Sequence, residues 1–324
     1  MSSVEPGILP ACEFVVDHAR HVRLDLAKLD ALARQWVDQP FQVPGWDEPI
    51  HWRGTPEETL HYVLLLDALN FCFWVDPGQT RWEVEYQGQA FNGYKALSVA
   101  LRRALEEGVT LTSAQTLAEL TADQLAHILR GKGEIPLLQE RLQHANQVGR
   151  QLLARWQGDF SRAVASCQGS ALALTALIAR DFPCFYDVSH FQGREIPIYK
   201  RAQITVVDIA GSLGFQGYGE FHDLDQLTAF ADYKIPQVLR ALGIMEYSEE
   251  LAQRVDQQQL LPPGSPEEVE IRAAMVWAVE LIRRAMAQQG RPLMAYELDW
   301  FFWNLGQSKL PGEKPYHRVR TVFY

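Results

Sequence analysis

The segment FADYKIPQ places an acid, a phenol and an amine next to each other, at Asp232, Tyr233 and Lys234. A carboxylate can stabilise a developing positive charge, and an ammonium group can bind an anion. Pro236 follows, and it disfavours helical geometry at the residue before it but suits the first turn of a new helix. The positive N-terminal end of such a helix favours nearby anions. This segment is therefore a candidate for ionic chemistry on a small ligand.

Two further segments combine acids with aromatic or basic residues. FPCFYD contains Phe185 and Asp187, and it follows an expected helix that ends at proline. YKRAQITVVD contains Lys200 and Asp208. Acidic groups beside aromatic rings are what a pocket for a cationic or aromatic ligand requires.

Each of these residues also has an ordinary structural interpretation. Asp232 is compatible with a turn at the end of a helix, Lys200 with a solvated cap, and Asp187 with a loop acid. Asp208 lies within an apolar helical pattern, where a buried charge needs a partner, and a structural salt bridge would satisfy it. Pattern alone does not separate these interpretations from a binding site.

The other motifs in the sequence give weaker evidence for a binding or catalytic site. His51 in PIHWRG is either a ligand-binding group or a surface loop residue, and the FCFW and DWFFWN runs are typical of core packing. No nucleophile elbow, phosphate-binding loop or dinucleotide fingerprint is present. The four cysteines form no CxxC pair and no cluster with histidine at zinc spacing. We therefore expect no metal and no cofactor.

The elements that must position these residues are mostly helical. Apolar residues recur at helical spacing, with Thr and Ser caps and a Ser265-Pro266-Glu267-Glu268 start signal for one helix. TRWEVEYQ at 80–87 alternates apolar and polar residues and predicts a strand in a small hairpin. The predicted helices cover 11–37, 56–70, 94–107, 120–131, 135–156, 159–181, a stretch from 266 onward, and 294–306. The helix from 266 onward has Ile271, Met275, Val279 and Ile282 on one face.

The polar trio is expected at an elbow between two helices. Asp223 can cap a short helix, with Gln226 at the reciprocal position, and that helix is predicted to continue through Phe230. The break is predicted near Tyr233, and the next helix is predicted to end at Gly243.

Composition sets broad limits. The chain has 324 residues, 47% of them hydrophobic and 22% charged, which is typical of a globular protein with a sizeable core. The net charge of −10 and the lack of a Lys/Arg-rich run argue against general nucleic-acid binding. No secretory signal pattern and no membrane-length apolar run are apparent, so we expect a cytoplasmic protein without membrane contact.

Four longer segments resemble the queuosine salvage protein family. They are LLLDALNFCFW, GYKALSVALRRALEEG, FPCFYDVSHFQGREIPIYKRAQITVVDIAG and LTAFADYKIPQVLRALGI. The similarity extends from about residue 11 to the C-terminus, and the order and separation of YKRAQI and FADYKIPQ make it specific.

This resemblance implies a mainly α-helical fold with a small β-hairpin element, similar to helix–hairpin–helix DNA glycosylases. It implies one queuosine-salvage glycosidase domain over residues 1–324, or two packed helical subdomains with a boundary near 110–160. The implied activity is hydrolysis of queuosine 5′-monophosphate to queuine and ribose 5-phosphate, so that queuine can be reinserted into tRNA.

The chemistry of the implied activity suggests roles for individual residues, which the resemblance does not by itself fix. Asp232 is the expected sugar-side carboxylate, as a nucleophile or as an electrostatic stabiliser. Lys200 is the first choice for the 5′-phosphate and Lys234 the second, and Tyr233 is expected to hydrogen-bond the substrate.

The base and its cationic arm need separate partners. Asp187 and Asp208 are expected to bind the queuine amine or the guanine-like edge of the base, and Phe185 is expected to stack on the deazapurine. His51 completes the set of expected substrate-binding residues.

Two other functions remain open at the level of sequence. One is a protein that binds queuine or its nucleotide without catalysis. The other is a base-excision glycosylase acting on nucleic acid, which only the fold analogy suggests and which the acidic charge disfavours. A small-molecule substrate without stable nucleic-acid binding is therefore expected, and the sequence does not fix the oligomeric state.

Overall fold

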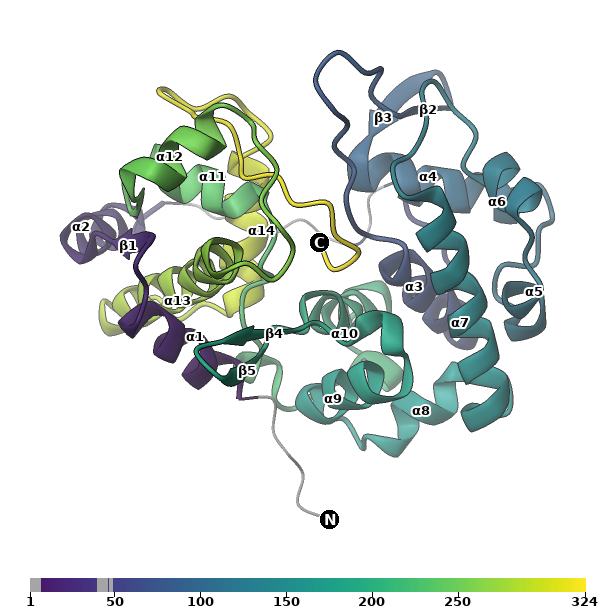
Figure 1. The fold of residues 1–324 in the computed structure, drawn as a ribbon. Helices are drawn as coiled ribbons and strands as arrows, with labels where there is room; N and C mark the ends of the chain where they lie inside the picture. The colour runs from purple at the N-terminus through teal and green to yellow at the C-terminus, as the bar shows by residue number, and fades with distance from the viewer. Residues whose placement is uncertain (1–6, 40–45, 47–48) are drawn as a thin grey trace. The chain divides into compact units, whose positions relative to one another are not determined.

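The computed structural model describes residues 7–39, 46 and 49–324. Its chain divides into two compact units. Unit 1 comprises residues 1–44, 187–200 and 223–321, and unit 2 comprises 45–186, 201–222 and 322–324. Both are mainly helical (Figure 1), which confirms the predicted fold class at that level. None of the helices in the described residues is long and apolar enough to cross a membrane.

Unit 1 is built around the long helix α13. Helices α1 and α2 pack against it, and Ile271, Met275, Val279 and Ile282 of α13 are buried, as the sequence pattern predicted. The elements of unit 1 are α1 (Ile8–Asp17), β1 (Val22–Leu24), α2 (Leu26–Trp36), β4 (Val188–Phe191), β5 (Arg194–Pro197), α11 (Lys234–Ala241), β6 (Met245–Tyr247), α12 (Glu249–Asp256), α13 (Pro266–Gln288) and α14 (Ala295–Leu305).

Unit 2 is organised around α3, in which every residue from Thr59 to Ala68 is buried. A helix that is buried all round belongs at the centre of its unit, and α4, α7 and α8 pack against it. The elements of unit 2 are α3 (Pro56–Ala68), β2 (Glu83–Tyr86), β3 (Gln89–Asn92), α4 (Gly93–Glu106), α5 (Ala114–Ala118), α6 (Ala122–Ile128), α7 (Leu138–Trp156), α8 (Phe160–Ser166), α9 (Ala171–Asp181) and α10 (Lys200–Ser212), whose first residue belongs to unit 1.

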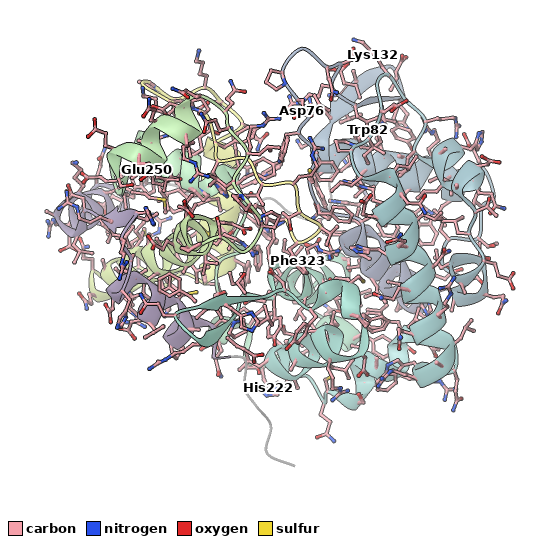
Figure 2. The ribbon with its side chains drawn as sticks, in the orientation of Figure 1. Asp76, Trp82, Lys132, His222, Glu250 and Phe323 are labelled. Atoms are coloured by element: carbon pink, nitrogen blue, oxygen red, sulfur yellow. The ribbon has the colours of Figure 1, made fainter. Side chains whose placement is uncertain are left out.

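The strands form small antiparallel pairs, β1 with β6, β2 with β3 and β4 with β5. The β2–β3 pair confirms the hairpin predicted from 80–87. Trp82, labelled in Figure 2, precedes this hairpin; it is buried and donates its indole N–H to the Leu129 carbonyl at 3.0 Å. That bond anchors the hairpin on the end of α6.

The Thr cap predicted for the helix at 120–131 and the start signal predicted at Ser265 are confirmed. Thr55 and Thr121 form capping boxes at α3 and α6, and the Ser265 hydroxyl accepts from the Glu268 N–H with Pro266 at the first helical position of α13. These caps depend only on residues within one turn, so sequence alone reveals them.

Two predicted helices are interrupted. The prediction of one helix over 11–37 is wrong, because Glu270 of α13 accepts hydrogen bonds from the backbone N–H groups of Arg20, His21 and Val22, and β1 follows. The predicted helix over 159–181 is likewise broken between α8 and α9, where Gly169 adopts a positive φ of 75°.

The helix predicted before the polar trio is also absent. Leu224–Gln226 forms one 3₁₀ turn, and residues 227–232 then run without regular structure to the start of α11. The helix–turn–helix elbow is therefore wrong on its N-terminal side. On its C-terminal side it is confirmed: Pro236 lies in the first turn of α11, and Gly243 follows its end with a positive φ of 71°.

Candidate active site

The carboxylate of Asp232 lies at the N-terminal end of α11 in unit 1. Its Oδ1 atom accepts hydrogen bonds from the backbone N–H groups of Lys234 and Ile235, each at 2.9 Å. Among the described residues no donor contacts Oδ2. The residue is only 8% exposed. One carboxylate oxygen thus fixes the side chain to the helix, and the other remains available to a ligand.

Two lysines set the electrostatics of this acid. Burial raises the pKa of Asp232 above its usual value, while the positive charges of Lys200 and Lys234, with the two backbone donors, oppose that rise. Lys200 is itself buried, and the Lys234 ammonium donates to the Gln237 side-chain oxygen at 2.9 Å. The structure thus places Asp232 near two cations, and the roles predicted for the three residues in catalysis stay predictions.

Tyr233 occupies the residue position just before α11 and is half-buried. Its ring lies 4.9 Å from that of Tyr316, centroid to centroid, at an interplanar angle of 45°. The pair places an aromatic surface beside the carboxylate turn. Sequence reasoning identified Tyr233 but not Tyr316, whose contact depends on a segment more than 80 residues further along the chain.

Asp187 has a different environment from the one expected. Both its oxygens accept from the guanidinium of Arg272, at 2.9 and 2.6 Å, and both residues are buried. Its Oδ2 also accepts from the backbone N–H of Lys200 at 3.3 Å. Both oxygens of the Asp187 carboxylate are thus hydrogen-bonded. Contact with a ligand amine stays a prediction, and the amine would have to share this carboxylate with Arg272.

A second buried acid, Asp299 of α14, was missed by the sequence analysis. Its Oδ1 accepts from the backbone N–H of Phe230 at 2.7 Å, two residues before Asp232. Burial and the negative charge of Asp232 raise the pKa of Asp299 well above its usual range. The raised pKa favours the uncharged form of Asp299, which adds no negative charge next to Asp232.

In unit 2, His51 and Asp208 both interact with Tyr94. The His51 ring stacks on Trp46 at 3.9 Å between centroids, its Nδ1 lies 3.2 Å from the Trp46 carbonyl, and its Nε2 lies 3.0 Å from the Tyr94 hydroxyl. Burial lowers the pKa of His51 to about 4. The ring is therefore neutral at pH 7, with Nδ1–H donating to the carbonyl and Nε2 accepting from Tyr94.

Burial, followed by the nearby negative charge of Asp208, raises the pKa of Tyr94 well above the usual value. The three residues form a polar group beside an indole ring. Such a group can read the edge of a heterocyclic base.

Phe185 lies in the core of unit 2. It is 1% exposed, and the Arg201 guanidinium lies over its ring at 5.0 Å from the centroid. Arg201 also donates to the carbonyls of Asp67 and Ala68, at 3.0 and 2.6 Å. The stacking of Phe185 on a base stays a prediction, since this ring already has a cation on it.

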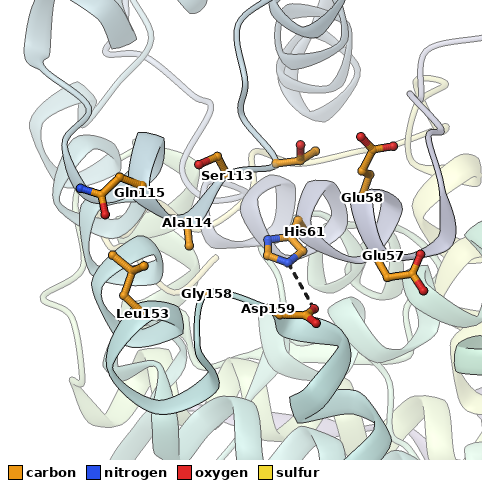
Figure 3. Close-up of a pocket in the computed structure, with 10 residues that line it drawn as sticks. Glu57, Glu58, His61, Ser113, Ala114, Gln115, Leu153, Gly158 and Asp159 are labelled. Atoms are coloured by element: carbon orange, nitrogen blue, oxygen red, sulfur yellow. Dashed lines mark ion pairs between the residues drawn. The ribbon is translucent and has the colours of Figure 1, made fainter.

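A surface hollow of about 390 Å³ in unit 2 includes none of the predicted residues (Figure 3). Its polar groups already serve the ends of helices. Glu58 belongs to the capping box of α3, Asp159 caps α8, and His61 Nε2 accepts from the Phe160 N–H at 3.0 Å, with 3.8 Å to Asp159. This hollow is explained by helix capping.

The predicted site residues thus fall into two groups. Asp187, Lys200, Asp232, Tyr233 and Lys234 belong to unit 1, and His51, Phe185 and Asp208 belong to unit 2. In the described part of the chain, no three His, Cys, Asp or Glu side chains are grouped to hold a metal ion. The unit 1 group has the components for stabilising a sugar cation and binding an anion, and the His51 group has those for recognising a base.

Comparison with known proteins gives matches that all carry queuosine in their names. The family model described as queuosine salvage protein matches residues 50–324. A Sphaerobacter thermophilus protein named queuosine 5′-phosphate N-glycosylase/hydrolase is 46% identical over 318 residues, which cover 98% of each chain.

Eukaryotic proteins of the same name match as completely. The Bos taurus protein is 34% identical, with 97% of each chain covered. The Schizosaccharomyces pombe protein is 31% identical over 98% of this chain and 99% of its own. The similarity therefore includes both units.

Proposed function

The chain belongs to the queuosine salvage protein family, and on that premise we propose that it hydrolyses the N-glycosidic bond of queuosine 5′-phosphate. The products are queuine and ribose 5-phosphate, and queuine becomes available for reinsertion into tRNA. The observation that carries this proposal is the match over nearly the whole chain to proteins that bear this enzyme name.

The reaction adds water across the bond between the ribose C1′ atom and the base. The C–N electron pair leaves with the base, C1′ gains positive charge, water supplies hydroxide to C1′, and its proton goes to the base. A buried carboxylate beneath the sugar stabilises that charge or attacks C1′ directly. Asp232 suits this role because Oδ1 is fixed by two N–H groups while Oδ2 contacts no donor among the described residues.

The leaving group increases the demand on this carboxylate. Purine hydrolases commonly protonate an imidazole nitrogen of the base, and a 7-deazapurine lacks that nitrogen. Stabilisation of the positive charge on the sugar must therefore account for a larger part of the reduction in activation free energy. The Lys200 and Lys234 charges support an ionised Asp232 despite its burial, so the acid can act at neutral pH.

The remaining roles follow from charge and hydrogen-bonding capacity. Lys200 binds the 5′-phosphate, with Lys234 as the second choice, and Tyr233 hydrogen-bonds the substrate. Asp208, His51 and Phe185 serve the base, and Asp208 is favoured over Asp187 for the queuine amine because Arg272 already occupies both Asp187 oxygens.

The proposal extends to architecture and setting. A single glycosidase domain, similar to helix–hairpin–helix DNA glycosylases, remains part of it, and the mainly helical units support this. Action on a free nucleotide, and not on tRNA or DNA, is also part of the proposal, and the net charge of −10 supports it. A cytoplasmic location is expected because the product feeds tRNA modification.

One assay tests the proposed function. Purified protein is incubated with queuosine 5′-monophosphate, and free queuine is followed by chromatography. We expect stoichiometric release of queuine and ribose 5-phosphate. Binding without release would indicate a carrier instead, and release only from queuosine-containing tRNA would indicate a nucleic-acid glycosylase.

A further inference from the structure

Arg272 of α13 connects two segments that carry predicted site residues. Its guanidinium forms the bidentate ion pair with Asp187 described above, at 2.9 and 2.6 Å. It also donates to the carbonyl of Ala231, from Nε at 3.4 Å and from Nη2 at 3.3 Å. The side chain is 1% exposed. A fully buried cation of this kind acts on the structure around it and has little access to solvent.

The first segment is the turn that carries Lys200. The Asp187 carbonyl accepts from the N–H groups of Ile198 and Tyr199, at 3.0 and 3.2 Å, and its carboxylate accepts from Lys200 N–H. Asp187 therefore closes the base of the β4–β5 hairpin and fixes the start of α10. Tyr199 adopts a left-handed φ of 47° at this point, a conformation that its surroundings must enforce.

The second segment is the irregular stretch that carries Asp232. Ala231 directly precedes that acid, so a donor to the Ala231 carbonyl restrains the peptide from which the Asp232 side chain extends. Residues 227–232 have no regular structure of their own, and a fixed partner is needed to hold one conformation. Arg272 supplies it from a rigid helix.

We infer that Arg272 is a positioning residue that sets the distance between the phosphate-binding cation Lys200 and the sugar-side carboxylate Asp232. This inference rests on the proposed function. A ribose 5-phosphate has a fixed span between its phosphate and C1′, so a substrate gains from both groups only when their separation is correct. Arg272 thereby makes the 5′-phosphate an aid to catalysis as well as to binding.

Only arginine fits this role. Its planar fork binds both oxygens of Asp187 and still presents N–H groups to a carbonyl, whereas lysine has a single point of contact. Arg272→Lys keeps the charge and removes the fork. Because a misplacement of about 1 Å can cost roughly a hundredfold in rate, a loss of this size is expected without loss of the Lys200 or Asp232 side chains.

The test compares two substrates, queuosine 5′-monophosphate and the unphosphorylated nucleoside. Their ratio of kcat/KM does not depend on how much of the protein is folded, so a merely structural role leaves it unchanged. For Arg272→Lys we expect kcat/KM to fall about a hundredfold on the monophosphate and about tenfold on the nucleoside. The ratio, which is the advantage given by the phosphate, then falls about tenfold.

Two controls make the result specific. Glu270→Gln alters another buried charge on α13, one that holds residues 20–22 and contacts no predicted site residue; it should lower stability and leave the ratio unchanged. Adding Arg272→Lys to Lys200→Ala should not lower the ratio further, because Arg272 acts through Lys200. If Arg272→Lys does not fold, Asp187→Asn, which keeps the shape and one acceptor oxygen, replaces it with the same expectation.

Two results would contradict this inference. One is an unchanged ratio in Arg272→Lys while activity and melting temperature fall together, and the other is a wild-type protein without any advantage for the monophosphate. A wild-type protein that releases no queuine from either substrate would instead contradict the proposed function.

Discussion

Glu270 and Asp232 are buried acids of unit 1 that each accept more than one backbone N–H group, and they are used differently. Glu270 accepts three N–H groups on one oxygen, from Arg20, His21 and Val22, at 3.1, 2.6 and 3.1 Å. Asp232 accepts two on Oδ1, and no donor among the described residues contacts its Oδ2. The Glu270 side chain extends from α13 and holds residues 20–22, whereas Asp232 lies at the start of α11 with two lysines nearby.

This difference indicates what separates a structural acid from a reactive one. A buried carboxylate that is surrounded by donors stabilises the fold, because removing it leaves those donors unsatisfied. Each acid has one carboxylate oxygen that no donor among the described residues contacts, so an unused oxygen does not separate the two. The lysine charges next to Asp232 do, because they suit an anionic ligand. Mutations should therefore change stability at Glu270 and activity at Asp232, and the predictions below test that division.

The largest effect on stability is expected at Glu270. Glu270→Ala leaves three backbone N–H groups without their acceptor and should lower the free energy of unfolding by about 3 kcal/mol or more. Chemical denaturation measures it. Glu250→Ala, at an exposed position on α12 (Figure 2), is the matched control and should change it by less than about 0.5 kcal/mol. A comparable loss in both variants would contradict the structural role of Glu270.

The next effect is on catalysis at Lys200. Lys200→Ala removes the cation assigned to the phosphate and should lower kcat/KM for queuosine 5′-monophosphate by about 30- to 100-fold, with a smaller loss on the nucleoside. Steady-state kinetics on both substrates measures it. The control is Lys28→Ala, which removes a surface lysine paired with Asp25 and should change neither value. Equal losses on the two substrates would remove Lys200 from the phosphate role.

A moderate effect is expected at Asp299. Its pKa is raised well above the usual range by burial and by the charge of Asp232, which favours the uncharged form that an amide resembles. Asp299→Asn keeps an acceptor for the Phe230 N–H and should match the wild type in stability at pH 7. Asp299→Ala loses that acceptor and should cost about 1–3 kcal/mol. Thermal unfolding of both variants distinguishes this from a role for the ionised acid, in which the Asn variant would be impaired as well.

The smallest expected effect is the change in the free energy of unfolding caused by Asp232→Asn. This change is opposite in sign to the one expected for Glu270→Ala. The raised pKa of Asp232 in the folded protein means that the unfolded chain loses this proton first as the pH rises. Ionisation therefore lowers wild-type stability between the unfolded and the folded pKa. Asp232→Asn should be more stable than the wild type at pH 7, with a difference that shrinks on acidification toward pH 4. A loss of stability at pH 7 would contradict this.

Sequence predicted those parts of the fold that depend on neighbours in the chain. The caps at Thr121 and Ser265 are local, and so is the start of α11 at Pro236. The segment before α11 was predicted wrongly because its backbone groups bond to Asp299 and Arg272, which lie 69 and 41 residues further along the chain from their partners. No periodicity encodes such bonds.

In the candidate site, too, features that depend on neighbours in the sequence were predicted, and long-range contacts were not. Asp232, Tyr233 and Lys234 were singled out because they are adjacent, and Lys200 and Asp187 because their segments combine charged with aromatic residues. Arg272 was missed although a charge in the apolar run EIRAAMVW is the same signal that drew attention to Asp208. A buried charge implies a partner, and only the structure identifies which one.

The most direct test of the central claim is queuine release by the wild type and by Asp232→Asn at equal concentrations of folded protein. The amide keeps the Oδ1 acceptor that binds α11 and removes only the charge. We predict that wild-type protein converts queuosine 5′-monophosphate to queuine and that Asp232→Asn is slower by at least about a thousandfold, with an undiminished melting temperature. Near wild-type turnover by Asp232→Asn would contradict the account.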